Sequence, residues 1–160
     1  MPLNRRQARE QAFIILFEYA FRGNIDEILE DFWERHRELV SANAAPAKLS
    51  QEGEARLDES YRSPCPNENY IRQICERFIS GMENIDETIG KHSKNWKKDR
   101  ISNVSLAVLR LGVCEMLYFD DIPMLVSISE ALEIVKKYEG EEAIPFVNGI
   151  LEGVRAEGDT

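Results

Sequence analysis

The sequence contains no long apolar run. Its longest uninterrupted apolar stretch covers residues 12–17, whereas a helix that crosses a bilayer needs about 20 apolar residues. The N-terminus also lacks the pattern of a secretory signal, because Glu10 and Glu18 interrupt the apolar residues and no small-residue cleavage site follows. We therefore expect no membrane-spanning segment and a cytoplasmic protein.

Cysteine and histidine are scarce as well. The three cysteines form no Cys-x-x-Cys pair, and the two histidines stand at no metal-ligand spacing. Cys75 and Cys114 fall on apolar helical stripes, which predicts a place in the core. The chain also has no glycine-rich phosphate loop and no nucleophile elbow. We expect no catalysis, no metal and no cofactor.

Charge is abundant but unevenly distributed. The net charge of −9 argues against a general nucleic-acid binder, yet residues 1–22 and 91–110 are basic. Residues 111–160 hold eleven acidic and three basic residues. This asymmetry is typical of a protein with one face for a polyanion and another for a different partner. Ordinary solvated surface charge is the alternative interpretation.

Apolar residues recur with the helical period, and strand-like alternation is nearly absent. The pattern predicts an all-α bundle of about seven helices, with 1–160 as a single domain. Asn4 with Gln7 predicts a capping box for the first helix, and Gly23 its end. Ser127 with Glu130 predicts another capping box before the helix at 128–138.

Two segments are less regular. Residues 42–66 contain three prolines and no sustained period, which predicts a long mobile loop, although 44–57 could form a weak extra helix. The helix that starts near Asn67 is expected to break near residues 81–84, before a short segment with Ile85 and Ile89. Residues 102–119 are apolar on most sides, and we expect that helix to be central.

Three arginines crowd the start of the first helix. Arg5, Arg6 and Arg9 occupy its first two turns, where the helix dipole is already positive. Guanidinium groups and free backbone amides together make an anion site that suits phosphate. The alternative is that these arginines pair with Glu10, Glu18 or the acidic C-terminal half.

Three stretches in order, "RRQAR", "LRLGVCEMLYFDDIP" and "SISEALEIVKKYEGEEAIPFVNGILEGV", resemble the NusB family of transcription antitermination factors. The most specific parts are LR-x-G-x-x-E-x-L from Leu109 and FVNG-x-L from Phe146. The resemblance implies two perpendicular three-helix subdomains that form one compact domain. It also implies binding of single-stranded boxA RNA of ribosomal RNA leaders together with NusE, a ribosomal small-subunit protein. The complex acts on the transcription elongation complex, without catalysis, to promote ribosomal RNA transcription.

The resemblance and the basic segments together indicate which residues carry this function. The resemblance implies that Phe17 contacts the partner protein. It also implies that the arginines at the start of the first helix and one phenylalanine ring contact RNA. The basic run at 91–100 adds two lysines to the RNA-contacting residues. The expected RNA-binding residues are Arg5, Arg6, Arg9, Phe146, Lys97 and Lys98. The alternative for Phe146 is a place in the core. The alternative function of the protein is a helical protein-binding scaffold without RNA contact. The acidic C-terminal half suits a basic ribosomal protein.

Overall fold

The protein is described by a computed structural model that covers residues 3–43, 67–93 and 101–158. These residues form six α-helices and one short 3-10 helix, and no strand occurs among them. The elements are α1 Arg5–Arg22, α2 Ile25–Asn43, α5 Glu68–His92, α6 Asn103–Tyr118, α7 Met124–Tyr138, η3 Glu141–Ala143 and α8 Ile144–Gly158. The predicted all-α class is thus confirmed. The arrangement in two perpendicular subdomains stays a prediction.

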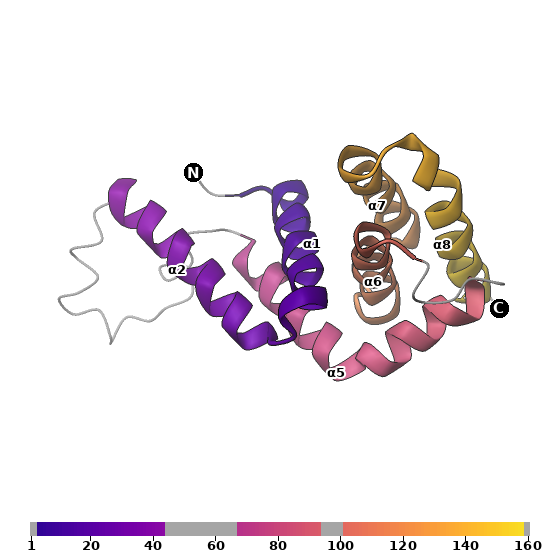
Figure 1. Cartoon of the computed structure of the whole chain (residues 1–160), viewed down its shortest axis with the longest axis horizontal. Coiled ribbons are helices and arrows are strands. Elements are labelled where there is room, and N and C mark those ends of the chain that lie inside the picture. The colour runs from indigo at the N-terminus through magenta and orange to yellow at the C-terminus, as the bar shows by residue number, and fades with distance from the viewer. Residues whose placement is uncertain (1–2, 44–66, 94–100, 159–160) are drawn as a thin grey trace.

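Helix α6 is the central element, as its composition predicts. It packs against α1, α5, α7 and α8, and α5 runs beneath the molecule from the α1–α2 pair to α8 (Figure 1). Every residue of α6 from Ser105 to Met116 is buried. Cys75 of α5 and Cys114 of α6 are buried free thiols, and burial raises the pKa of each to about 12. Both cysteines therefore belong to the core, as predicted.

Helix α1 begins and ends where the local sequence predicts. The Asn4 side chain accepts a hydrogen bond from the Gln7 amide, and the Gln7 side chain accepts one from the Asn4 amide. Such a cap stabilises a helix by about 1 kcal/mol. Gly23 follows the last turn at φ 70°, a left-handed conformation that favours glycine. The cap therefore sets the start of α1, and with it the position of the arginines at its amino end.

The predicted break in the third helix is wrong, because α5 continues from Glu68 to His92. Ile85 and Ile89 continue its buried stripe. Gly81 lies opposite the ring of Tyr118, whose hydroxyl oxygen would be 2.4 Å from a Cβ at this position. The glycine therefore provides close approach between α5 and α6 rather than a break.

The predicted capping box of Ser127 and Glu130 is also wrong. Helix α7 already begins at Met124, after Pro123, so both residues lie inside the helix. Their side chains point to other helices: the Ser127 hydroxyl donates to Glu115 and Glu130 accepts from Arg6. A local pattern that fits a cap thus serves contacts between helices.

The loop predicted at 42–66 is wrong for its first two residues, because α2 extends to Asn43. Residues 44–66, which include the possible extra helix and Cys65, lie outside the described residues. In the part of the chain that the structure describes, no helix is long and apolar enough to cross a membrane. The same residues contain no group of three or more His, Cys, Asp or Glu side chains placed to hold a metal ion.

Candidate nucleic-acid interface

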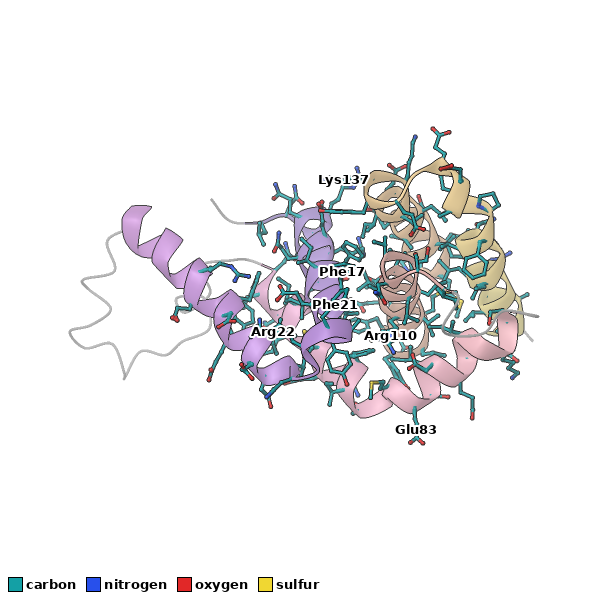
Figure 2. The ribbon with its side chains drawn as sticks, in the orientation of Figure 1. Phe17, Phe21, Arg22, Glu83, Arg110 and Lys137 are labelled. Carbon is teal, nitrogen blue, oxygen red and sulfur yellow. The ribbon has the colours of Figure 1, made fainter. Side chains whose placement is uncertain are left out.

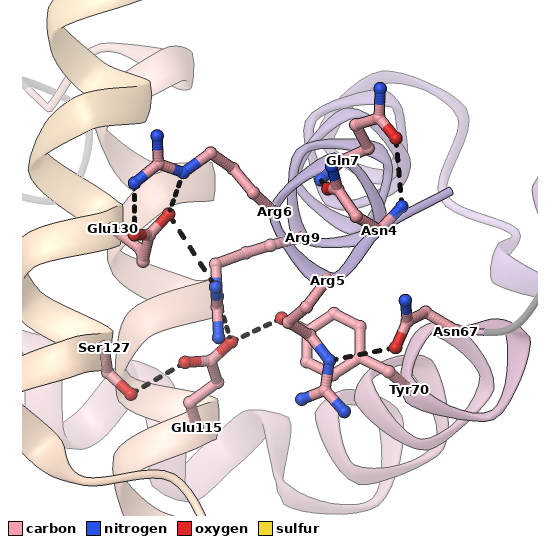
Figure 3. Close-up of polar contacts among 10 residues, drawn as sticks. All are labelled: Asn4, Arg5, Arg6, Gln7, Arg9, Asn67, Tyr70, Glu115, Ser127 and Glu130. Atoms are coloured by element: carbon pink, nitrogen blue, oxygen red, sulfur yellow. Dashed lines mark hydrogen bonds and ion pairs between the residues drawn. The ribbon is translucent and has the colours of Figure 1, made fainter. Parts of the chain in front are cut away.

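The three arginines of α1 occupy three different environments (Figure 3). Arg9 is buried, with 6% of its side chain exposed, and its Nε donates to Glu115 Oε2 at 2.7 Å. Burial acts to lower the pKa of Arg9, but the attraction of Glu115 and of nearby Glu130 outweighs it and leaves the pKa raised. Arg9 thus remains a charged group inside the protein.

Glu115 completes the surroundings of Arg9. Its side chain is 1% exposed, Tyr70 Oη donates to Oε2, and Ser127 Oγ donates to Oε1 at 2.7 Å. Burial and the Glu115 charge raise the pKa of Tyr70 well above its usual value, so this hydroxyl stays a donor. One carboxylate therefore connects α1, α5 and α7 to α6. A buried ion pair is favourable only when further hydrogen bonds of this kind complete it.

Arg6 is held at the surface instead. Its Nε and Nη2 donate to the two carboxylate oxygens of Glu130 at 3.0 and 2.9 Å. The Arg6 side chain is 70% exposed, whereas that of Glu130 is 16% exposed. Hydrogen bonding to Glu130 raises the pKa of Arg6. The guanidinium group is thus fixed in place while most of its surface faces outward.

Arg5 lies on the other side of the helix start. Its Nε donates to Asn67 Oδ1 at 3.2 Å, and its guanidinium carbon lies 4.6 Å from the centre of the Tyr70 ring. Asn67 in turn donates to the carbonyl of Leu3 at 2.9 Å. The exposed Arg5 has no carboxylate among these partners, so its charge is available to an anion.

The alternative interpretation of the arginines is therefore correct for two of them. Arg6 and Arg9 do pair with acidic residues of the C-terminal half, Glu130 and Glu115. For Arg9 the pairing is internal, and its predicted RNA contact stays a prediction. For Arg6 the pairing leaves the side chain exposed.

Of the other predicted RNA-binding residues, only Phe146 lies in the part of the chain that the structure describes. Phe146 is half-buried on α8 and packs against the core, and Figure 1 shows α6 and α7 between α8 and α1. Its role at RNA stays a prediction. Lys97 and Lys98 lie outside the described residues. Within the basic run, Lys91 is described, and its Nζ lies 2.6 Å from a carboxylate oxygen of Glu157.

Phe17, the expected partner-contacting residue, belongs to an aromatic row on α1 (Figure 2). Its ring centre lies 6.1 Å from that of Phe13 and 5.2 Å from that of Phe21. Phe17 is half-buried, whereas Phe21 is 64% exposed. Phe21 is absent from the predicted site residues, although its spacing of four residues from Phe17 puts it on the same helix face.

The residues that hold the arginines in place are likewise absent from the predicted site: Asn67, Tyr70, Glu115, Ser127 and Glu130. One signal was present. Glu115 is an acidic residue in a helix that is otherwise apolar on most sides, and a buried carboxylate requires a partner. Which arginine would supply it was not evident from spacing.

These observations define an all-helical protein with exposed guanidinium groups at one helix start, where an anion can bind. The chain belongs to the NusB family, whose family model matches residues 6–156. It is similar to the transcription antitermination protein NusB of Natranaerobius thermophilus, at 37% identity over 154 residues, which cover 95% of this chain and 94% of that protein.

Solved structures agree in fold. A structure of T. maritima NusB matches with a TM-score of 0.73 at 31% identity, covering 98% of this chain and 94% of that chain. A chain in a crystal structure of the antitermination factors NusB and NusE in complex with dsRNA matches with a TM-score of 0.67 at 26% identity. That match covers 96% of each chain.

Proposed function

We propose that this protein is a transcription antitermination factor that binds single-stranded boxA-type RNA of nascent ribosomal RNA leaders together with NusE. In this role it joins the transcription elongation complex in the cytoplasm and promotes ribosomal RNA synthesis, without catalysis and without a cofactor. Membership of the NusB family supports the proposal, as do a relative named as an antitermination protein and a solved structure that contains NusB, NusE and RNA.

The observation that carries the RNA-binding part is the exposure of Arg5 and Arg6 at the amino end of α1. Their guanidinium groups lie where the helix dipole favours an anion, and arginine recognises phosphate with two parallel hydrogen bonds. We assign phosphate contacts to Arg5 and Arg6. Arg9 stabilises the start of α1 through its buried ion pair with Glu115. A direct contact of Arg9 with RNA remains part of the proposal.

The remaining predicted residues keep their predicted roles in the proposal. Phe146 presents an aromatic ring on which an unpaired base can stack, and Lys97 and Lys98 add positive charge. Phe17 contacts NusE, and we add the neighbouring exposed Phe21 to this contact. The acidic residues of α7 and α8 attract a basic ribosomal protein through long-range charge.

A salt titration of RNA binding tests the proposal. A labelled single-stranded boxA-type RNA and a scrambled strand are titrated with the parent and with the variant Arg5→Ala plus Arg6→Ala, each with and without NusE. For single strands, the log–log plot of affinity against salt concentration has a negative slope, and the slope becomes shallower by about 0.7 for each lost phosphate contact. We therefore expect the slope of the double variant to be shallower by about 1.4, with weaker binding.

Arg22→Ala is the matched control, because Arg22 lies at the other end of the same helix and pairs with Glu18 and Asp31. This change removes one positive charge from α1, where the double variant removes two, and is expected to leave the slope unchanged. Equal and salt-insensitive binding of boxA and scrambled RNA by all variants would favour the helical scaffold, provided that NusE still binds.

A further inference from the structure

Glu130 lies where two arginines of α1 converge. Its Oε1 accepts from Arg6 Nε at 3.0 Å and lies 3.8 Å from Arg9 Nη1, while its Oε2 accepts from Arg6 Nη2 at 2.9 Å (Figure 3). The carboxylate comes from α7, a different helix from the arginines. A protein carboxylate thus lies between two guanidinium groups, in surroundings that also suit a phosphate.

We propose that Glu130 is an internal competitor of RNA, which sets the affinity of the site by holding the Nε–Nη2 edge of Arg6. This inference rests on the proposed function and adds to it a residue that tunes RNA binding through Arg6. RNA that binds Arg6 through this edge displaces Glu130, and RNA that binds another edge does so next to its negative charge.

The geometry supports competition for Arg6 in particular. Carboxylate and phosphate bind the same planar guanidinium fork with two parallel hydrogen bonds, so one edge serves one of them at a time. Arg6 is 70% exposed, whereas Glu130 is 16% exposed. The arginine is therefore the partner that RNA can reach. Arg9 is different, because Glu115 remains its partner when Glu130 is lost.

Removal of the Glu130 charge therefore has two effects of opposite sign. The free protein loses an ion pair between α1 and α7, so its melting temperature falls by a few degrees. The same change frees Arg6 and removes a negative charge from the RNA site, so RNA affinity rises. A purely structural role would lower stability without any gain in RNA affinity.

The experiment measures the Kd of a labelled single-stranded boxA-type RNA at several salt concentrations. The proteins are the parent, Glu130→Gln, Arg6→Ala and the double variant, with circular dichroism as the check on folding. Glu130→Gln is expected to bind about two- to fivefold more tightly, the range that corresponds to a surface ion pair. In the Arg6→Ala background the same substitution is expected to give a clearly smaller gain, because only the loss of the nearby negative charge remains.

The matched control is Glu83→Gln, the same loss of charge at an exposed position on α5, away from the arginines (Figure 2). An unchanged or weaker affinity of Glu130→Gln overturns the inference, as does an equal gain with and without Arg6. If the parent binds RNA and the variant Arg5→Ala plus Arg6→Ala binds it more weakly, either of these two outcomes overturns the inference about Glu130 and leaves the proposed function intact. Failure of the parent to bind RNA, alone and with NusE, overturns both the inference and the proposed function.

Discussion

At the scale of single residues, Arg9 is a charged group held inside the protein. It is enclosed with Glu115, Tyr70 and Ser127, and each of the three polar side chains around Glu115 donates to one of its two oxygens. Such a group stabilises the fold only as a complete set, because each lone buried charge or hydroxyl would cost free energy. Arg9 and Glu115 are therefore residues of the core, although both are charged.

Substitution of Glu115 by Gln tests this point. The change leaves Arg9 charged and buried with only the more distant Glu130 as counter-ion, and we expect the free energy of unfolding to fall by about 3 kcal/mol. Urea denaturation of parent and variant measures the difference, with Glu83→Gln as the exposed control that stays within about 0.5 kcal/mol. A Glu115→Gln protein as stable as the control would mean that the pair contributes nothing.

At the scale of elements, the ends of α1 follow local sequence, while contacts between helices do not. Asn4, Gln7 and Gly23 bound α1 as predicted, because a cap involves backbone groups only a few residues away. The pattern at Ser127 and Glu130 misled for the converse reason: their partners lie on α6 and α1. The continuity of α5 through Gly81 likewise depends on Tyr118 of α6.

Two glycines of α5 are expected to respond oppositely to alanine. A Cβ on Gly81 would lie 2.4 Å from Tyr118 Oη and 2.8 Å from its Cζ, so the whole ring must shift. At Gly90 nothing lies within 4 Å. Gly81→Ala should destabilise the protein by about 1 kcal/mol or more, whereas Gly90→Ala should stabilise it by up to about 1 kcal/mol through helix propensity. Thermal unfolding of both variants measures this, and equal stability would show that Tyr118 yields without cost.

At the scale of the whole molecule, charge is divided between the start of α1 and the acidic C-terminal half, and ion pairs join the two. Arg6 contacts Glu130 and Arg9 contacts Glu115, while Lys137 Nζ of α7 donates to Glu10 of α1 at 2.8 Å. The chain carries a net charge of −9, yet the acidic residues of α6 and α7 partly neutralise the arginine cluster. The surface offered to an anion is therefore smaller than the sequence suggests.

Stability is expected to decline in acid partly through Glu10. Burial acts to raise its pKa, but hydrogen bonds from Lys137 and Tyr138 outweigh it and leave the pKa below its usual value of 4.5. A carboxyl with a lower pKa in the folded state adds stability above pH 4.5, and loses it as the pH falls through the folded pKa. Glu10→Gln should therefore flatten the pH dependence of the unfolding free energy below about pH 5. Urea denaturation across pH 3–7 measures this, and parallel curves for parent and variant would contradict it.

The order of residues alone predicts the all-α class, the ends of α1, the central place of α6 and the burial of Cys75 and Cys114. These features depend on apolar periodicity and on backbone hydrogen bonds between near neighbours, which the order of residues specifies directly. Which arginines face outward depends instead on how the helices pack. The partners of Arg9 and Arg6 are 106 and 124 residues away in the chain, on α6 and α7. Since packing of the helices brings those carboxylates to α1, no local pattern distinguishes a buried arginine from an exposed one.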